Sequence, residues 1–350
     1  MAIIHESQNT FWRSRLKESA FGTRLAHSAD YRRILTTDKS PFTHGAATEN
    51  DGDHAHGSDR PQNVWLTGRN TGKSFPTQFN FTDIGYALIA ALGSVSTSGA
   101  GTDKTHAITP QSMNTSRQLP SYTMGQKIGG AWLDIFTSMV CNSLSISGSR
   151  TGRIQVSEEY VGNGAYEQDP SSYAQPSLTS GLEFGYAQQC TVNLTDGGSF
   201  DEDLECLLEE WSWSFNNNLD QDGGYRICSA EFSAGVPESG YVRNELLVGV
   251  RDYKFNGTYR LNSSTDPMRG AFDAGTILTV THAITSTRDI PTTSTPWSLT
   301  IEHTRARIIE ANIVVVNGYD AVQFTAELLS SSGSIPLTAT LVNNIASYTT

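Results

Sequence analysis

The feature that most constrains this chain is a pentapeptide that occurs twice. Residues 105–109 and residues 281–285 both read Thr-His-Ala-Ile-Thr. The preceding sequence repeats as well, because residues 75–81 and 255–261 carry large apolar side chains at the same spacing. A match that extends beyond the pentapeptide, over so long a period, is typical of one structural unit used twice.

The repeat continues downstream in the same order. Residues 153–156 (Arg-Ile-Gln-Val) correspond to residues 321–324 (Ala-Val-Gln-Phe). The chain of 350 residues is long enough for two domains of ordinary size, each with its own core. We therefore predict two copies of one domain in tandem.

The composition of the other segments sets the domain boundaries. Residues 163–181 are rich in Gly, Ser, Tyr and Pro, and we expect a linker there. Residues 1–63 are expected to form an N-terminal arm and an extended loop, apart from one strand at 31–37. The first domain then spans residues 64–162, completed by that strand, and the second spans residues 182–350.

Alternation of apolar and polar residues predicts a mainly β fold. The clearest case is residues 211–219, where three aromatic residues alternate with Ser and Asn. We favour packing of these rings in a core over an aromatic platform that binds sugar. A helix is predicted over residues 84–92, after a cap at Thr82 or Asp83, and a second short helix begins at Asp266-Pro267.

Two long hairpins are predicted, one in each copy. Residues 142–161 alternate on both sides of a turn at 148–152, and residues 306–328 turn at Asn317-Gly318, a strong hairpin signal. Residues 68–74 (Gly-Arg-Asn-Thr-Gly-Lys-Ser) resemble a phosphate-binding loop, but they are one residue short between the glycines and lead into a strand. We favour a hairpin turn there.

Charge and hydropathy disfavour several classes of partner. The net charge of −12 opposes tight binding to nucleic acid. No apolar run approaches the roughly 20 residues that cross a bilayer, and the first residues lack the pattern of a signal peptide, so we expect no membrane association. The four cysteines (Cys141, Cys190, Cys206 and Cys228) form no CxxC pair, which favours reduced thiols over disulfides or a metal site.

The sequence contains no catalytic motif that we can identify, so we expect no enzyme activity and no cofactor. Adjacent glutamates at 158–159 and 209–210 could serve glycoside hydrolysis. Neighbours in a strand point to opposite faces, however, so we favour solvated charges. The repeated His106 and His282 stand beside threonines in predicted strands, and we favour a structural role over a catalytic one.

A metal site is conceivable in the loop at residues 49–59. Its weak candidate ligands are Asp51, Asp53, His54 and His56. The loop has neither a complete calcium-binding pattern nor a second ligand cluster nearby, so we favour a polar loop over a metal site.

With the duplication in view, the chain resembles the major tail tube proteins of bacteriophages with long non-contractile tails. Five segments carry the resemblance, and they occur in order through most of residues 64–345. They are Asp83-Ile-Gly-Tyr-Ala-Leu-Ile-Ala-Ala-Leu-Gly-Ser, Leu119-Pro-Ser-Tyr-Thr, Asn142-Ser-Leu-Ser-Ile-Ser with its return strand, Ser214-Phe-Asn-Asn-Asn-Leu and Pro336-Leu-Thr-Ala-Thr-Leu.

The resemblance implies two tandem β-sandwich or β-barrel domains, each with one short flanking helix and long hairpins. It implies a structural protein of the virion tail, assembled in the host cytoplasm, whose stacked rings form the hollow tube through which DNA passes. Many members with one such domain form rings of six, so two domains imply trimeric rings with pseudo-sixfold symmetry. The implied partners are further copies of the chain, the tape measure, tail terminator and distal tail proteins, and viral DNA only in transit.

On this interpretation the two hairpins line the lumen and an N-terminal segment connects the rings. The lumen candidates are Ser143, Ser145, Ser147, Arg150, Arg153, Gln155, Ser157 and Glu159 in the first copy, and Arg307, Glu310, Asn312, Gln323, Thr325 and Glu327 in the second. The candidates for contacts between rings are Trp12, Arg13 and Arg15. We also expect part of the net acidity to face the lumen, so that DNA slides through without binding.

The main alternative is a cell-surface or fimbrial β-sandwich adhesin, a binding module instead of a tube. The missing signal-peptide pattern and the lack of paired cysteines disfavour it. A β-sandwich glycosidase is the third possibility.

Overall fold

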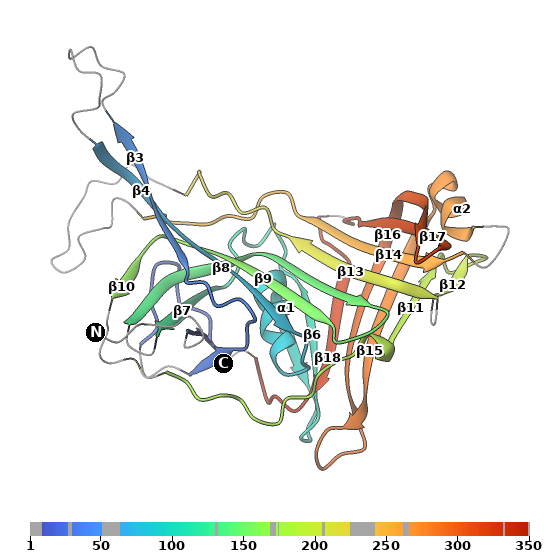
Figure 1. The fold of residues 1–350 in the computed structure, drawn as a ribbon, viewed down its shortest axis with the longest axis horizontal. Helices are drawn as coiled ribbons and strands as arrows, with labels where there is room; N and C mark the ends of the chain where they lie inside the picture. The colour runs from blue at the N-terminus through green and yellow to red at the C-terminus, as the bar shows by residue number, and fades with distance from the viewer. Residues whose placement is uncertain are drawn as a thin grey trace.

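A computed structural model describes residues 9–26, 30–50, 64–129, 132–168, 173, 175–204, 207–224, 242–261, 266–331 and 333–348. The protein is mainly β, as predicted, and all the strand pairings named below are antiparallel (Figure 1). The elements are β1 (Thr10–Ser14), β2 (Tyr31–Ile34), β3 (Thr43–Asn50), β4 (Val64–Gln78), α1 (Asp83–Leu92), β5 (Gly93–Ser98), β6 (Lys104–Pro110), β7 (Ser121–Ile128), β8 (Trp132–Ser149), β9 (Gln155–Gly162), β10 (Tyr166–Gln168), the 3-10 turn η2 (Ala187–Gln189), β11 (Cys190–Thr195), β12 (Asp201–Asp203), β13 (Leu208–Asn216), β14 (Asp252–Arg260), α2 (Pro267–Ala274), β15 (Ile277–Asp289), β16 (Pro296–Val316), β17 (Tyr319–Leu328) and β18 (Leu337–Asn343).

Eight strands form one continuous sheet along the long axis of the molecule (Figure 1). Their order is β3–β4–β9–β8–β13–β14–β17–β16. The two halves of the chain meet inside this sheet, because β8 comes from the first half and β13 from the second. We call it the long sheet.

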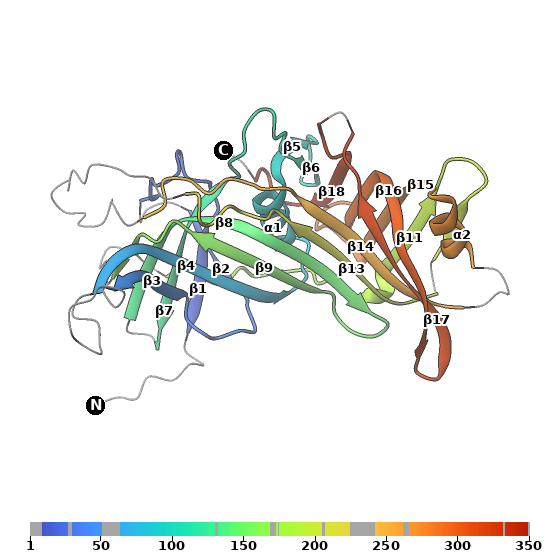
Figure 2. The same cartoon turned by 90° about the horizontal axis from the view of Figure 1, so that it is seen from above.

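A second series of strands packs against the apolar face of the long sheet (Figure 2). Its order is β12–β11–β15–β16–β18–β6–β5. β16 belongs to both layers: up to residue 307 it pairs with β15 and β18, and from residue 306 onward it pairs with β17. Because β18 pairs with β6, the end of the chain is also joined to the first half in this layer.

The other long strand, β8, changes partner at a kink. Its first part pairs with β7 and its second part with β9 and β13. Ser138 lies at the kink with φ of 53°, a conformation that a non-glycine residue adopts only when its surroundings hold it. The buried carboxylate of Glu18 accepts hydrogen bonds from the Ser138 amide (2.9 Å) and hydroxyl (2.6 Å), and from the hydroxyls of Ser121 (2.9 Å) and Thr123 (2.8 Å). Glu18 therefore connects the N-terminal segment to the kink.

The core lies between the two layers. Trp213 and Phe255 project from the long sheet and are fully buried. The Trp213 indole donates a hydrogen bond to Nδ1 of His282 in the second layer, at 2.8 Å. Helix α1 begins at Asp83, ends at Gly93 with φ of 99°, and is buried along its whole length from residue 84 to residue 92. The apolar alternation of the strands thus produces a core between two layers of antiparallel strands, with one buried helix.

Glycines in the long sheet allow large rings to lie on the backbone of neighbouring strands. Gly148 and Gly257 are the cross-strand neighbours of Trp211 on its two sides. A Cβ atom at Gly148 would lie 2.7 Å from the Trp211 indole, and a Cβ at Gly257 would lie 2.7 Å from the Phe324 ring. The lack of a side chain at these two positions is what allows the close approach.

The expected turn at residues 68–74 is wrong, because these residues lie inside the continuous strand β4. Gly72 adopts an extended conformation and pairs with Thr43 of β3 and Val161 of β9. Glycine and asparagine favour turns locally, but here pairing with β3 up to residue 72 and with β9 from residue 71 onward decides the conformation.

The N-terminal segment also differs from the expected arm. Strand β1 lies between β2 and β7, and Phe11 and Trp12 are buried at 1% and 0% exposure. The segment expected as a linker contributes β10, which pairs with β8. Both segments bury apolar side chains on the body of the protein. Tyr166 of β10 stacks on Phe136, which in turn stacks on Phe42.

We predict that Gly148→Ala lowers the free energy of unfolding by about 1–3 kcal/mol, because the added methyl group collides with the Trp211 ring. Chemical denaturation measures the change. Gly270→Ala is the matched control: nothing lies within 4 Å of a Cβ there, and in helix α2 the substitution is expected to be neutral or slightly stabilising. Equal stability of Gly148→Ala and the wild type would contradict the packing described here.

Candidate functional site

The outer face of the long sheet carries rows of polar side chains that run across the strands. One row passes from Ser147 in β8 through Ser212, Asn256 and Thr325 to Glu310 in β16. These residues are exposed or half-buried, whereas the residues that alternate with them face the core. The face is therefore a polar surface that five consecutive strands build together.

The structure brings together the residues that were predicted to line a lumen. Twelve of the fourteen lie in β8, β9, β16 and β17 on this polar face, and Arg150 and Arg153 lie in the turn between β8 and β9. The twelve are Ser143, Ser145, Ser147, Gln155, Ser157, Glu159, Arg307, Glu310, Asn312, Gln323, Thr325 and Glu327. They share one face because each pairs directly with another member across the sheet.

No residue of β13 or β14 was among those predicted to line a lumen. Ser212 and Ser214 of β13, and Lys254 and Asn256 of β14, fill the middle of the polar surface. The signal was present, since Trp-Ser-Trp-Ser and Tyr-Lys-Phe-Asn both alternate. The aromatic residues between them are buried (Trp211 is 5% exposed), so their rings are in the core, as favoured, and offer no open platform for a sugar.

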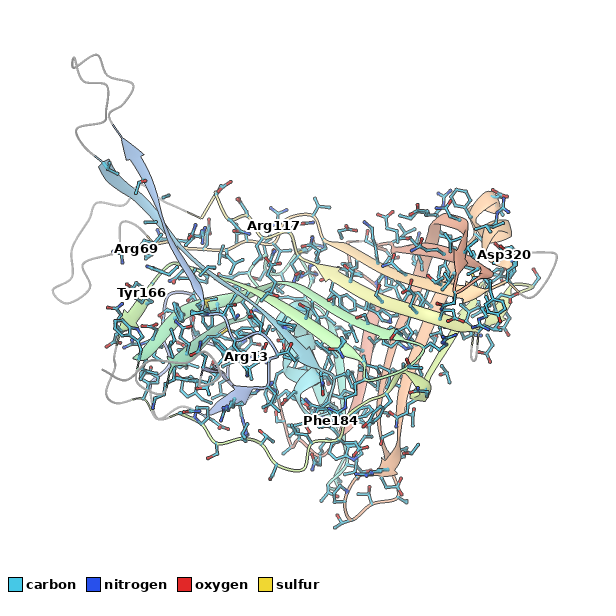
Figure 3. All side chains as sticks on the ribbon, in the orientation of Figure 1. Arg13, Arg69, Arg117, Tyr166, Phe184 and Asp320 are labelled. Atoms are coloured by element: carbon cyan, nitrogen blue, oxygen red, sulfur yellow. The ribbon has the colours of Figure 1, made fainter. Side chains whose placement is uncertain are left out.

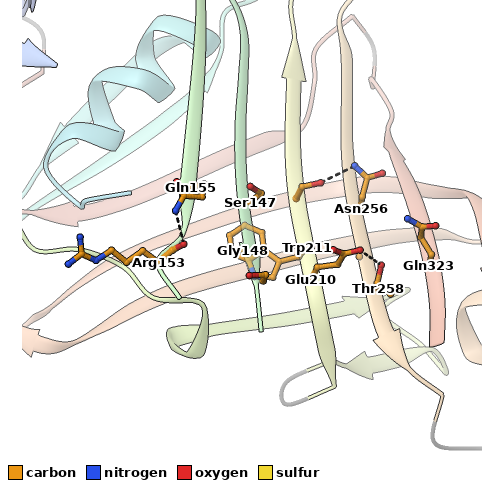
Figure 4. Close-up of a pocket in the computed structure, with 12 residues that line it drawn as sticks. Ser147, Gly148, Arg153, Gln155, Glu210, Trp211, Asn256, Thr258 and Gln323 are labelled. Carbon is orange, nitrogen blue, oxygen red and sulfur yellow. Dashed lines mark hydrogen bonds between the residues drawn. The ribbon is translucent and has the colours of Figure 1, made fainter. Parts of the chain in front are cut away.

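A shallow hollow of about 430 Å³ lies on this face above Gly148 and Gly257 (Figure 4). Asn256 donates a hydrogen bond to the Ser212 hydroxyl at 3.2 Å, and Thr258 donates one to Glu210 at 3.1 Å. The hollow is lined mainly by hydroxyl and amide groups of short side chains. Such a surface offers scattered, weak hydrogen bonds instead of a focused set of groups around one ligand.

Charges on the polar face are few and mixed. Its carboxylates are Glu159, Glu210, Asp252, Glu310 and Glu327, and its cations are Lys254 and Arg307, with Arg153 in the turn beside it. The Lys254 amine lies 2.8 Å from the Asp252 carboxylate, and this hydrogen bond raises the pKa of Lys254. In the sheet Glu327 pairs with both Lys254 and Arg307, so these two cations each stand beside a carboxylate.

The residues expected to connect rings are placed differently. The indole of Trp12 lies over the backbone of Gly125 and is fully buried, and Arg13 is 1% exposed. Arg13 donates hydrogen bonds to Tyr160 and to Glu158 (3.4 Å). Both side chains are buried in contacts within the chain, so neither is available to contact a stacked ring of subunits. Arg15 is partly exposed and forms an ion pair with Asp30 at 3.3 Å.

The candidate metal ligands Asp51, Asp53, His54 and His56 lie outside the described residues. Within the described residues, no group of three or more His, Cys, Asp or Glu side chains is arranged to hold a metal ion.

Of the cysteines in this part of the chain, Cys141 and Cys190 are free thiols, and burial raises the pKa of Cys190 to about 12.

The glutamate pairs point to opposite faces, as expected for a strand: Glu158 and Glu209 are buried, whereas Glu159 and Glu210 are exposed. The repeated histidines are both fully buried in strands. His106 bonds to Thr97 (2.9 Å) and Asn343 (3.1 Å), and burial lowers its pKa.

Within the described residues, no further strand lies beside β16 at this end of the long sheet, and helix α2 packs against β16. From residue 308 to residue 316, β16 forms a single ladder, with β17, so its other backbone edge faces away from the sheet. The exposed apolar side chains at this end form what we call the edge patch: Phe272 (41%), Ile277 (41%), Ile309 (40%), Ile313 (52%), Val315 (71%) and Tyr319 (58%). The apolar face of the hairpin thus extends beyond the core, as expected of an interaction surface.

At the other end of the long sheet, β3 forms one ladder, with β4, and this ribbon projects from the body (Figure 1). Figure 3 shows the two ends of the molecule, marked by Arg69 near the ribbon and Asp320 in β17. A sheet that ends in strand edges on both sides can be extended at both.

We predict that the buried histidines make the fold sensitive to mild acid. Burial lowers the pKa of His282 to about 3 and that of His303 to about 4, against about 6.5 in the unfolded chain. The unfolded state therefore binds more protons below pH 6.5, and stability falls as the pH drops from 6.5 toward these values. Between pH 7 and pH 5, His282 alone contributes a loss of about 2 kcal/mol.

The control is His282→Gln, whose amide oxygen can still accept the hydrogen bond from Trp213. Denaturation of both proteins at pH 7 and pH 5 compares the two losses. The variant is expected to lose about 2 kcal/mol less than the wild type over this range, and an unchanged loss would contradict the neutral, buried state of His282.

The described helices are both too short to span a membrane. No model of a known protein family matches the chain, and no curated protein shows significant sequence similarity to it. The function has to be inferred from the geometry of the chain.

Proposed function

We propose that this chain is a structural protein that assembles with copies of itself into closed rings, which stack into a hollow tube. The observation that carries the proposal is the order of strands in the long sheet. It consists of two sets with the same arrangement, β3–β4–β9–β8 and β13–β14–β17–β16. In each set a helix follows the second strand, and a hairpin supplies the last two strands.

The register within the two sets supports the duplication. The sequence repeat equates Thr77 with Gly257, and Val156 with Phe324. In the structure Thr77 pairs with Val156, and Gly257 pairs with Phe324. The two pairs are separated by different lengths of chain, so the agreement does not follow from the spacing alone. One difference is that β5 stands between α1 and the first pentapeptide, whereas α2 leads directly into β15, which holds the second.

The joint between the two sets suggests how copies meet. β8, the last strand of the first set, pairs with β13, the first strand of the second. By the same rule, β16 of one copy pairs with β3 of the next copy and the segment before it. This contact is head to tail, and such contacts close into rings when the rotation between copies allows it. A closed ring leaves no strand edge open.

The number of copies follows from the resemblance to tail tube proteins. Three chains supply six sets, and so the six domains of a tube ring, with three times eight strands around the lumen. The apolar face of the long sheet is occupied by the second layer, so the polar face is the one that lines the lumen. Its short hydroxyl and amide side chains and paired cations give passing DNA few contacts to hold.

This proposal places the chain in the tail of a virion, with tape measure, tail terminator and distal tail proteins as further partners. Catalysis and cofactors have no part in it.

We predict that Val315→Lys prevents ring formation without unfolding the chain. Val315 is 71% exposed, so a lysine there costs the monomer little, but it would place a charge in the contact between copies. Negative-stain microscopy and analytical ultracentrifugation measure assembly. Val250→Lys is the control, because Val250 is 87% exposed and lies outside the edge patch. Rings of the Val315→Lys protein as abundant as those of the control would argue against pairing at this edge.

We further predict that Ser145→Lys combined with Ser214→Lys leaves assembly intact and makes the assembled protein bind DNA. The two serines are half-buried neighbours across the β8–β13 joint on the polar face. Added cations there should increase salt-dependent retention of a DNA fragment, measured by co-sedimentation with assembled protein. Retention equal to that of wild-type assemblies would mean that this face does not line the lumen.

A further inference from the structure

The net charge of the chain is confined to its second half. Residues 1–181 contain 15 basic residues (Lys and Arg) and 15 acidic residues (Asp and Glu). Residues 182–350 contain 9 basic and 21 acidic residues. The whole net charge of −12 therefore belongs to the second half. Because β16 and β17 end the long sheet in this half, the two ends of the molecule differ in charge.

Exposed carboxylates are sequence neighbours of three residues of the edge patch. Asp273, Glu310 and Asp320 are all exposed, and each adjoins a patch residue in sequence. Glu202 of β12 also lies near this end; burial, Asp201 and Asp266 raise its pKa. The cations at this end are Arg269, Arg305 and Arg307, together with Arg260, whose guanidinium lies over the ring of Tyr319 and pairs with the buried Glu209.

At the other end Arg15, Lys17, Arg24, Arg33 and Lys39 are at least partly exposed, whereas Arg13 and Arg32 are buried in ion pairs with Glu158 and Asp83. The edge strand β3 itself carries no Lys or Arg.

Equivalent positions at the internal joint lack these charges. Ser157 and Glu159 of β9 correspond in the sequence repeat to Thr325 and Glu327 of β17. Their partners in β8 and β16 therefore correspond too: Ser145 to Glu310, and Ser143 to Arg307. At these positions β8, which pairs with β13, carries uncharged serines, whereas β16 carries charged side chains. Charge is thus found on the strand whose partner must come from outside the chain.

We propose that the carboxylates around the edge patch select its partner: they reject the edge patch of a second copy and admit that copy's opposite end. This inference rests on the proposed head-to-tail assembly. Two identical β16 edges could pair antiparallel about a twofold axis, and their exposed apolar side chains would favour it. Such a dimer would bring the carboxylates of both copies together, and like charges at an interface are strongly unfavourable.

The consequence for assembly is that the edge patch stays available. A twofold dimer would cover both β16 edges and end growth, because neither copy could then accept a third. Among the described residues 30–50 of the opposite end, the carboxylates are Asp30, Asp38 and Glu49, and the first two pair with Arg15 and Lys73. The head-to-tail contact therefore brings fewer like charges together. Salt should weaken the selection, since exposed charges further apart than about 10 Å are largely screened at 0.1 M.

The test is chemical crosslinking between identical positions. Val315→Cys places a thiol in the edge patch, and a short bismaleimide joins two such thiols only when two patches face each other. In this background, Asp273→Asn, Glu310→Gln and Asp320→Asn remove three carboxylates. We expect them to raise the yield of crosslinked dimer about tenfold at low salt, and high salt to raise the yield of the parent protein in the same direction. The same protein without Val315→Cys corrects for the native cysteines.

The matched control removes the same number of charges elsewhere in the second half. Asp222→Asn, Asp289→Asn and Glu302→Gln replace three exposed carboxylates outside the edge patch. A comparable rise in crosslinking with this control would show that only total charge matters and would overturn the inference. So would a high yield from the parent protein that is the same at low and high salt.

Ring formation, followed by microscopy of the same samples without the crosslinking cysteine, separates this inference from the proposed function. If wild-type rings form but the edge variant gives no more crosslinking than its control, selection by charge is wrong and the head-to-tail assembly stands. If no rings form under any condition, the assembly itself fails, whatever the crosslinking shows.

Discussion

The structure depends on the pairing of β8 with β13. Seven residue pairs, from Ser143–Asn216 to Ser149–Glu210, join the two halves of the chain into one sheet. On the core side of this joint, Ile146 pairs with Trp213, and the Trp211 indole packs on the backbone of Gly148. The cores of the two halves are therefore continuous. Without this ladder each half would expose another strand edge, and the buried aromatic residues of β13 would lose their cover.

The same kind of joint explains the two ends of the molecule. In the proposed assembly, the β8–β13 pairing is one head-to-tail contact between equivalent sets, and the last and first sets of the chain supply the surfaces for a second such contact between copies. The internal contact is permanent and buries Trp213 and Phe215 completely, whereas the free end exposes Ile313 and Val315. The carboxylates beside these residues are consistent with a surface that must remain soluble until the correct partner arrives.

Local features of the fold were predictable from the sequence. Helix α1 starts at Asp83 and ends at Gly93, and the β16–β17 hairpin turns at Asn317–Gly318, because caps and turns are set by neighbouring residues. The polar face followed from alternation, which fixes which residues share a side of a strand. Arg150 and Arg153 are exceptions, since they lie in a turn.

Features that depend on distant pairing were not predictable. The glycines of residues 68–74 indicated a turn, but β3 and β9 hold them in a strand. The apolar and basic residues at the N-terminus suggested an arm, yet Arg13 is buried against Glu158 and Tyr160, about 145 positions away. No local pattern encodes such contacts. The β8–β13 and β6–β18 ladders, which join the halves, are of the same kind.

The central claim is that the β8–β13 joint is repeated between copies. A cryo-electron microscopy reconstruction of the assembled protein tests it most directly, because it shows which strand of the next copy lies beside β16. The account predicts three copies per ring, with β16 antiparallel to β3 or the segment before it, and the polar face toward the axis. A ring in which β16 meets β16, or in which the polar face points outward, would contradict it.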